Sequence, residues 1–234
     1  MRLTDTHTCT RSHTLTLTCL LVGFLLSACS TGQFEFDEDD AIDGNLYRVT
    51  NASVGLAYAN PDVDFSRYTK IMLNDLDTSK TVVKQPRNTS STVGNQPFEL
   101  TAQNRESLAT AYREMFEKEL AETGDYEIVD APGPDVLRIA AALTEIAPTA
   151  AKDDNRSRPT GRSRVYTEGA GAMAITFAFG DSETDTVLAI VKDSREGTPM
   201  WGLNNAVTNM RDVRIIFGRW ARMVRARLDI AHGY

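Results

Sequence analysis

The sequence predicts an α+β fold: an antiparallel-rich sheet of about five strands with two amphipathic helices on one face, a two-layer sandwich. Two observations lead to this prediction. Segments with the two-residue period of a strand are interrupted by only two segments of helical period, in the order β-α-β-β-β-β-α. The turn at 181–185 between two late strand segments is short, as in a hairpin of antiparallel neighbours.

The predicted strands are short runs of apolar or alternating residues, and the polar stretch 77–99 between the first strand and the first helix predicts a long loop. Large side chains alternate with alanine and threonine in the fourth strand, so one of its faces is low. The last strand is apolar on both faces, which is typical of a central strand. The five segments are 68–73, 126–129, 136–146, 172–179 and 187–191.

Both predicted helices carry an apolar stripe, so each should pack one face against the sheet. Thr101 is a suitable N-cap for a helix that runs to about Thr123 and stops at Gly124. The final helix covers about 210–230, with Asn209 as its expected N-cap. The stripes contain Leu108, Tyr112, Met115, Phe116 and Leu120 in the first helix, and Val213, Ile216, Phe217, Trp220, Val224 and Leu228 in the second.

The N-terminal segment has the features of a secretory signal. Its apolar run, 15–26, is too short for a ~30 Å hydrocarbon core, which needs about 20 residues, but it suits the apolar region of a signal peptide. The run ends in Leu26-Ser27-Ala28-Cys29, which resembles a bacterial lipobox. We therefore expect a signal peptide over 1–28, recognised through Leu26, Ser27 and Ala28, and lipidation of Cys29. Cleavage elsewhere, as in an ordinary signal peptide, is the alternative.

The destination follows from the same resemblance. No aspartate follows the cysteine, where it would favour retention in the inner membrane, because residue 30 is Ser30. Similarity to Gram-negative lipoproteins then implies the periplasmic leaflet of the outer membrane. Several acyl chains on Cys29 would anchor the protein stably, whereas a single chain binds only marginally.

Residues 29–46 predict an acidic flexible tether between the lipid and a single periplasmic domain, 47–234. The stretch 30–45 holds six acids and no base, so self-repulsion should extend it. A calcium loop is excluded there, because Ala41 stands where the next carboxylate ligand belongs.

Reactive side chains are scarce beyond the tether. No cysteine follows Cys29, and the one later histidine, His232, falls in a tail expected to fray. This composition excludes a disulfide framework and a Cys/His zinc or haem site, so we expect no metal and no cofactor. The formal net charge of -7 argues against nucleic acid as a partner.

Three segments carry a resemblance to a known family. Asp64-Phe65-Ser66-Arg67-Tyr68, the strand 126–130 and Pro132-Gly133-Pro134-Asp135 follow one another in this order. The succession resembles the bacterial lipoproteins grouped as domain of unknown function 3313, over roughly residues 60–230. The resemblance implies a periplasmic lipoprotein with this α+β order. It implies no catalytic residues, because no activity is assigned to the family.

A row of arginines lies opposite the apolar stripe of the last helix: Arg211, Arg214, Arg222 and Arg225, with Arg219 nearby. One interpretation is a surface that binds anions or a partner's carboxylates, and the other is a solvated helix face. The basic loop 152–164 has the same two interpretations. Arg227 falls beside the stripe and should extend to water or pair with a carboxylate.

The predicted function is non-catalytic binding of a cell-envelope component, protein or glycan, by a domain held at the membrane through the acyl chains on Cys29. The alternative is a periplasmic cell-wall glycan hydrolase that works through two carboxylates. Glu145 and Glu168 are the pair that such an enzyme would use.

Overall fold

The computed structural model describes residues 34–86, 98–149, 166–168, 171–198, 201–203 and 206–234. The chain divides into two units, Met1–Thr31 and Gly32–Tyr234, and all described residues belong to the second. The predicted signal peptide, Cys29 and the basic loop 152–164 lie outside the described residues, as do the side chains of 166–168 and 201–208.

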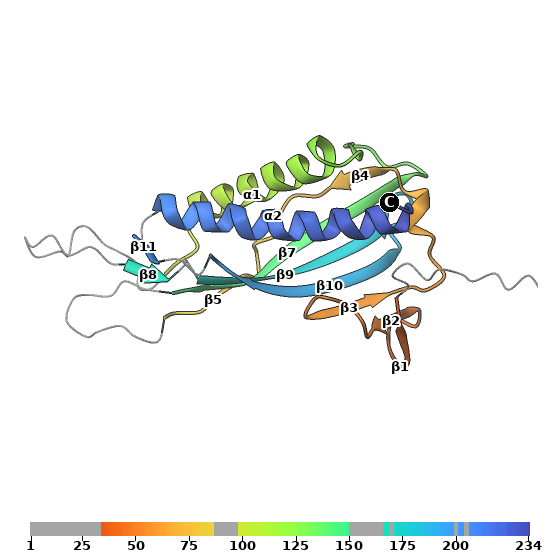
Figure 1. Cartoon of the computed structure of the whole chain (residues 1–234), viewed down its shortest axis with the longest axis horizontal. Helices are drawn as coiled ribbons and strands as arrows, with labels where there is room; N and C mark the ends of the chain where they lie inside the picture. Colours follow the sequence, from red (N-terminus) through yellow and green to blue (C-terminus); the bar gives the residue numbers. More distant parts are fainter. Residues whose placement is uncertain (1–33, 87–97, 150–165, 169–170, 199–200, 204–205) are drawn as a thin grey trace, which may run out of the picture. The chain divides into compact units, whose positions relative to one another are not determined.

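Within the described residues, nine strands form one large sheet in the order β1-β2-β3-β10-β9-β7-β4-β6, with β5 paired to β7 (Figure 1). The α+β class is confirmed, but the sheet has more strands than the predicted five. A separate two-stranded sheet pairs β8 (Tyr166–Glu168) with β11 (Trp201–Leu203). The strands of the large sheet are β1 (Phe36–Ile42), β2 (Leu46–Val49), β3 (Leu56–Ala59), β4 (Lys70–Leu73), β5 (Val82–Val83), β6 (Glu127–Ile128), β7 (Val136–Pro148), β9 (Gly171–Asp181) and β10 (Val187–Glu196).

The N-terminal hairpin of β1 and β2 overturns the prediction of a flexible tether for residues 36–42. Its loop contains Asp43 and Gly44, both with positive φ (51° and 78°), as tight hairpin loops require. The acids of β1 do not keep it from pairing, because a neighbour neutralises part of their charge. Asp40 accepts hydrogen bonds from Arg48 at 3.3 Å and from the Tyr58 hydroxyl at 2.9 Å.

The stretch 77–99 is also more ordered than the predicted loop. Val82 and Val83 form β5, which pairs in parallel with Glu145 and Ile146 of β7. The sheet is therefore mixed: β4 also pairs in parallel with both β6 and β7, whereas β1, β2, β3, β10, β9 and β7 are joined by antiparallel pairs.

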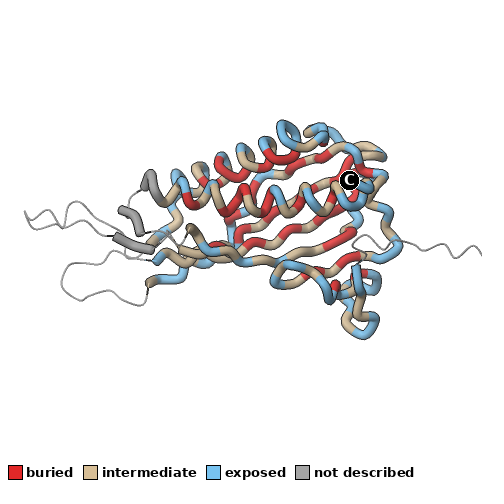
Figure 2. The backbone as a smooth tube through the Cα atoms, in the orientation of Figure 1, coloured by how far each residue is buried: buried red, intermediate tan, exposed pale blue. Residues whose placement is uncertain are grey.

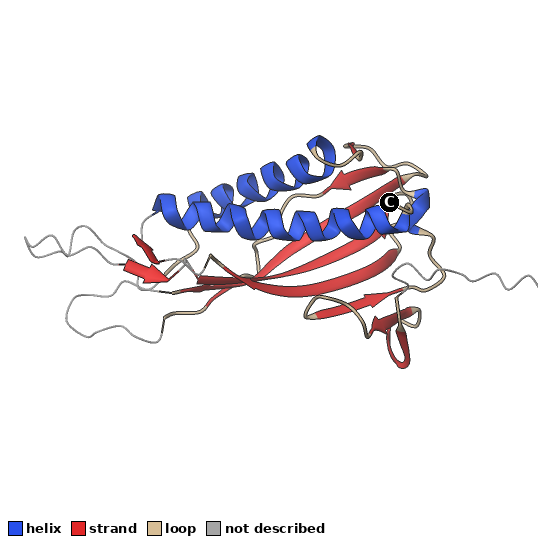
Figure 3. Cartoon of the chain, viewed as in Figure 1, coloured by secondary structure: helices blue, strands red, loops and turns tan. Residues whose placement is uncertain are grey.

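Both described helices cover the same face of the large sheet, as expected (Figures 1 and 3). Helix α1 (Ala102–Glu117) continues into a π-helical turn, Lys118–Glu122. Thr101 caps it in a capping box with Asn104, which confirms the predicted start. Helix α2 runs from Ala206 to Ala231, so the predicted N-cap Asn209 is wrong: the helix begins four residues before the predicted 210.

The core lies between the two helices and the inner face of the sheet (Figure 2). Phe116, Phe177, Phe217 and Trp220 are fully buried, and the Phe177 and Trp220 rings meet edge to face at 6.3 Å. Burial of each such side chain contributes roughly 1.5–3 kcal/mol, so the two stripes explain why both helices dock on one face. Among the described helices, none is long and apolar enough to cross a membrane.

Candidate functional site

An apolar cavity of about 120 Å³ lies between the C-terminal half of α2 and strands β3 and β10. Its wall includes three alanines of the sheet and three larger side chains of α2. The alanines are Ala57, Ala59 and Ala189, and the helix contributes Met223, Val224 and Leu228.

The cavity exists because the inner face of the sheet carries small side chains at this place. Ala59 and Ala189 are cross-strand partners, and Ala57 faces Val191 two residues along. In β9, by contrast, Phe177 fills the space below the helices. The space is lined almost entirely by apolar side chains and is partly open to solvent, which makes it a candidate for binding an apolar group.

A cation and an aromatic ring stand at the mouth of the cavity. The Arg227 guanidinium lies 5.4 Å from the centre of the Phe34 ring, and its Nη2 donates a hydrogen bond to Ser53 Oγ at 3.1 Å. Phe34 is 38% exposed and meets Phe36 edge to face at 6.4 Å. In the part of the chain that the structure describes, no carboxylate pairs with Arg227, so of the two expected alternatives the ion pair is absent there.

The predicted arginine row takes part mainly in the packing of the two helices. Arg211 is exposed, with no hydrogen bond or ion pair to another described residue, whereas the other three meet carboxylates of α1 and its π turn. Their distances are 3.2 Å from Arg214 to Glu114, and 3.6 Å and 3.5 Å from Arg222 and Arg225 to Glu119. Because Glu119 is buried, these pairs stabilise the contact between helices. Anion or partner binding by the row stays a prediction.

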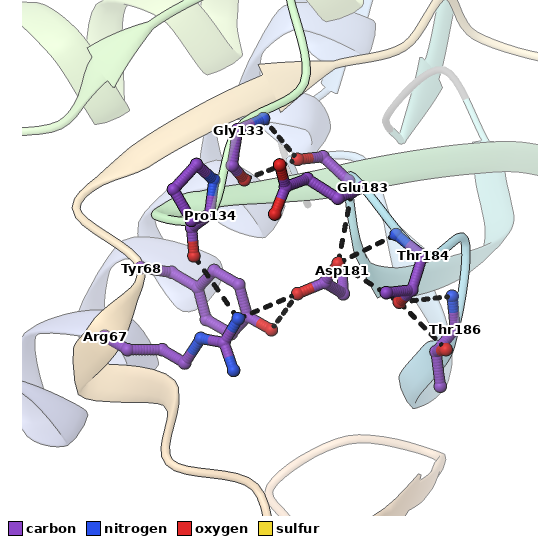
Figure 4. A network of polar contacts seen from close by, with 9 residues as sticks. Arg67, Tyr68, Gly133, Pro134, Asp181, Glu183, Thr184 and Thr186 are labelled. Atoms are coloured by element: carbon purple, nitrogen blue, oxygen red, sulfur yellow. Dashed lines mark hydrogen bonds and ion pairs between the residues drawn. The ribbon is translucent and has the colours of Figure 1, made fainter.

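Two of the three segments that carried the family resemblance, 64–68 and 132–135, meet around the buried carboxylate of Asp181, at the end of β9 (Figure 4). Its Oδ2 accepts hydrogen bonds from Arg67 Nη2 and the Tyr68 hydroxyl, both at 3.0 Å. Its Oδ1 accepts from the backbone N–H groups of Glu183 and Thr184 at 3.1 and 2.9 Å, and from the Thr184 hydroxyl. Both oxygens are thus used within the fold, which makes Asp181 a structural junction.

The second motif joins the same junction through backbone atoms. The Ser182 hydroxyl bonds to the N–H and the carbonyl of Gly133, and Arg67 donates to the carbonyl of Pro134 at 3.3 Å. The donated hydrogen bonds, first that of the Thr184 N–H, lower the pKa of Asp181 below its usual 3.8. Burial, with the hydrogen bond to Asp181, raises the pKa of Tyr68 to about 12.

The carboxylate pair of the hydrolase alternative is only half described. Glu145, near the end of β7, forms an ion pair with Lys84 Nζ at 2.6 Å, while the Glu168 side chain lies outside the described residues. The distance between the two carboxylates would test the hydrolase alternative, which therefore stays a prediction. Among the described residues, no group of three or more His, Cys, Asp or Glu side chains is arranged to hold a metal ion.

The C-terminal tail does not fray as expected. His232 Nδ1 lies 2.8 Å from the Leu228 carbonyl, and its ring meets Tyr126 edge to face at 5.6 Å. The Tyr126 hydroxyl in turn donates to Asp229 at 2.9 Å. Sequence reasoning missed this because the contact joins residues about 100 positions apart.

Comparisons with known proteins give one family match. Curated proteins gave no match. Among solved structures, a PelC dodecamer from Paraburkholderia phytofirmans is 11% identical at a TM-score of 0.35, over 67% of this chain and 88% of that one. A DUF330 protein from Xanthomonas campestris is 9% identical at 0.37, over 70% and 85%. At these TM-scores the likenesses carry no argument about function.

The family model DUF3313, described as a protein of unknown function, matches residues 46–224. The match contains the Asp181 junction and the three alanines of the cavity, while Phe34 and Arg227 at its mouth lie outside it. It covers well over half of the sequence, so this chain belongs to the DUF3313 family.

Proposed function

We propose that this protein is a lipoprotein anchored through Cys29 in the periplasmic leaflet of the outer membrane, and that its folded domain binds another envelope component without catalysis. The lipobox-like Leu26-Ser27-Ala28-Cys29 and the membership of DUF3313 support the anchor. The observation that carries the proposal is the position of β1, which begins at Phe36, seven residues after Cys29.

A tether this short limits the distance between the folded domain and the membrane. Seven extended residues span at most roughly 25 Å, at up to 3.6 Å per residue. A lipid on Cys29 would therefore hold the β1–β2 hairpin and the mouth of the cavity next to the bilayer. The proposed partner is then a component within reach of the membrane surface.

A binding role also agrees with how the described side chains are used. Both carboxylate oxygens of Asp181 accept hydrogen bonds within the domain, and Glu145 is paired with Lys84. The cavity, in contrast, offers apolar surface and a cation, which suit binding better than proton transfer. For a protein or glycan partner, crosslinking in cells followed by mass spectrometry identifies the molecule.

The anchor is tested by Cys29→Ser. The wild-type protein should stay in the membrane fraction through a high-salt wash and leave it in detergent, because acyl chains hold it. The variant should appear in the soluble fraction or as an unprocessed precursor. Cys19→Ser, inside the predicted signal peptide, is the matched control and should fractionate like the wild type. An unchanged membrane fraction for Cys29→Ser would refute the anchor.

A further inference from the structure

We propose that the cavity under α2 binds the alkyl chain of a short-chain fatty acid such as hexanoate, with the carboxylate of that fatty acid paired to Arg227. The proposal goes beyond the function above, because neither the cavity nor Arg227 depends on a lipid at Cys29. Two features carry it: an apolar cavity of limited volume, and a cation at its mouth without a described carboxylate partner.

The walls select an alkyl chain. Apart from Arg227, Ser53 and Tyr58, every residue that lines the cavity is apolar. Apolar walls of this kind take up apolar molecules, as a 150 Å³ engineered cavity takes up benzene. A volume of about 120 Å³ therefore fits a few methylene groups of one chain, and not the two chains of a phospholipid.

The gain per methylene is enough for specific binding. Each buried CH₂ group contributes about 0.8 kcal/mol, which corresponds to roughly a fourfold increase in affinity. A few groups inside the cavity therefore raise the affinity by about two orders of magnitude.

Arg227 selects the acidic end. Three other arginines of the same helix, Arg214, Arg222 and Arg225, already face carboxylates. Arg227 instead lies over the Phe34 ring and uses Nη2 for Ser53. A guanidinium has five N–H donors, so enough remain for a two-point contact with a carboxylate. One cation at the mouth matches the single charge of a fatty acid.

Photo-crosslinking tests the proposal on the full chain in its membrane. Isolated membranes without ATP are incubated with a diazirine-bearing hexanoate, so that no label enters lipids by synthesis, and adducts are mapped by peptide mass spectrometry. We expect label on the peptides that carry Val54, Val191 and Val224, and at least tenfold better competition by hexanoate than by uncharged hexanol.

Variants separate the cavity from the cation. Ala57→Phe and Ala189→Leu fill the cavity by different routes and should each reduce the labelling at least tenfold, with thermal melts to show that the variants are folded. Arg227→Gln should reduce it about tenfold. Arg211→Gln is the matched control, because Arg211 is an exposed arginine of the same helix, and it should label like the wild type.

Four results would overturn the proposal. Labelling that both folded cavity variants retain would place the adducts outside the cavity. Equal labelling of Arg227→Gln and Arg211→Gln, or equal competition by hexanol, would remove the role of the charge. Stronger competition by lysophosphatidylglycerol than by hexanoate would replace the fatty acid with a phospholipid.

Discussion

At the scale of single residues, the carboxylate of Asp181 joins segments that lie far apart in the chain. It links Arg67 and Tyr68 to the turn after β9, and its neighbour Ser182 links that turn to Gly133. Asp181→Asn keeps the size but removes the charge, and it places an N–H group against donors. We expect a loss of about 2–3 kcal/mol in the free energy of unfolding, measured by urea denaturation. Asp185→Asn, which changes an exposed partner of Arg138 in the same turn, should cost less than about 1 kcal/mol.

The pH dependence of this effect has a defined sign. Because folding lowers the pKa of Asp181, its ionised form stabilises the fold above the unfolded value near 3.8, and the contribution is lost as the pH falls through the lower folded value. The stability difference between wild type and Asp181→Asn should therefore be constant between pH 5 and 8 and shrink below about pH 4. For Tyr68 the pKa rises to about 12, so its contribution persists below pH 10 and is lost as the pH passes 12. A difference that does not change in acid would contradict the role of the charge.

Sequence reasoning found only part of this junction. It singled out Asp64 to Tyr68 and Pro132 to Asp135 as distinctive segments. It did not find Asp181, because an aspartate at a strand end has no local pattern that distinguishes it from other acids. Its role arises from donors more than 100 residues earlier in the chain.

At the scale of elements, the apolar stripes of both helices are predictable, whereas the partners of the α2 arginines are not. The stripe residues Phe116, Phe217 and Trp220 are fully buried, as their spacing predicts. Glu119, however, lies in the π turn Lys118–Glu122, and the changed hydrogen-bond step rotates it relative to a regular helix. No local sequence pattern predicts a π-helical turn. The sequence therefore could not predict that Glu119 faces Arg222 and Arg225.

The cavity between α2 and the sheet makes a prediction about stability. Ala57→Val adds two methyl groups to an empty space and should increase the free energy of unfolding by about 1 kcal/mol. Ala141→Val is the matched control, since Ala141 is a buried inner-face alanine of β7 that does not line the cavity. Overpacking there should destabilise the protein by about 1–3 kcal/mol. If Ala57→Val destabilised the protein in urea denaturation as Ala141→Val does, there would be no free space at Ala57.

At the scale of the whole molecule, the two-layer order of helices and sheet follows from the sequence, but the extent of the sheet does not. The acidic composition before residue 46 concealed a hairpin, although Asp43-Gly44 is a recognised turn signal. Likewise β5 has only two residues, too few for any period to be visible. Of the candidate site, the arginine row could be predicted from the sequence. The cavity could not, because the alanines of β3 that line it lie about 130 residues before Ala189 of β10.

The N-terminal hairpin should contribute to stability as a strand and not through its charges. Replacing Phe36–Ile42 with a Gly/Ser segment of equal length removes the pairing with β2 and the packing of Phe36 on the core. We expect a loss of about 1–2 kcal/mol in urea denaturation, from the partly buried side chains. Replacing only Glu38 and Asp39 with serine should leave the stability nearly unchanged. If the variant with the replaced segment were as stable as the wild type, the prediction of a flexible tether would hold for these residues.

The position of β3 in the sheet also imposes an order of events on folding. Ala59 pairs with Ala189, so 130 residues of chain separate the two sides of this ladder. A polypeptide grows from its N-terminus, and the edge of β3 that pairs with β10 therefore has no partner until β10 is complete. Open strand edges attract other chains, and distant pairings form slowly. The nascent protein consequently passes through a period in which it needs protection from aggregation. The strand that ends this period, β10, is among the last to be synthesised.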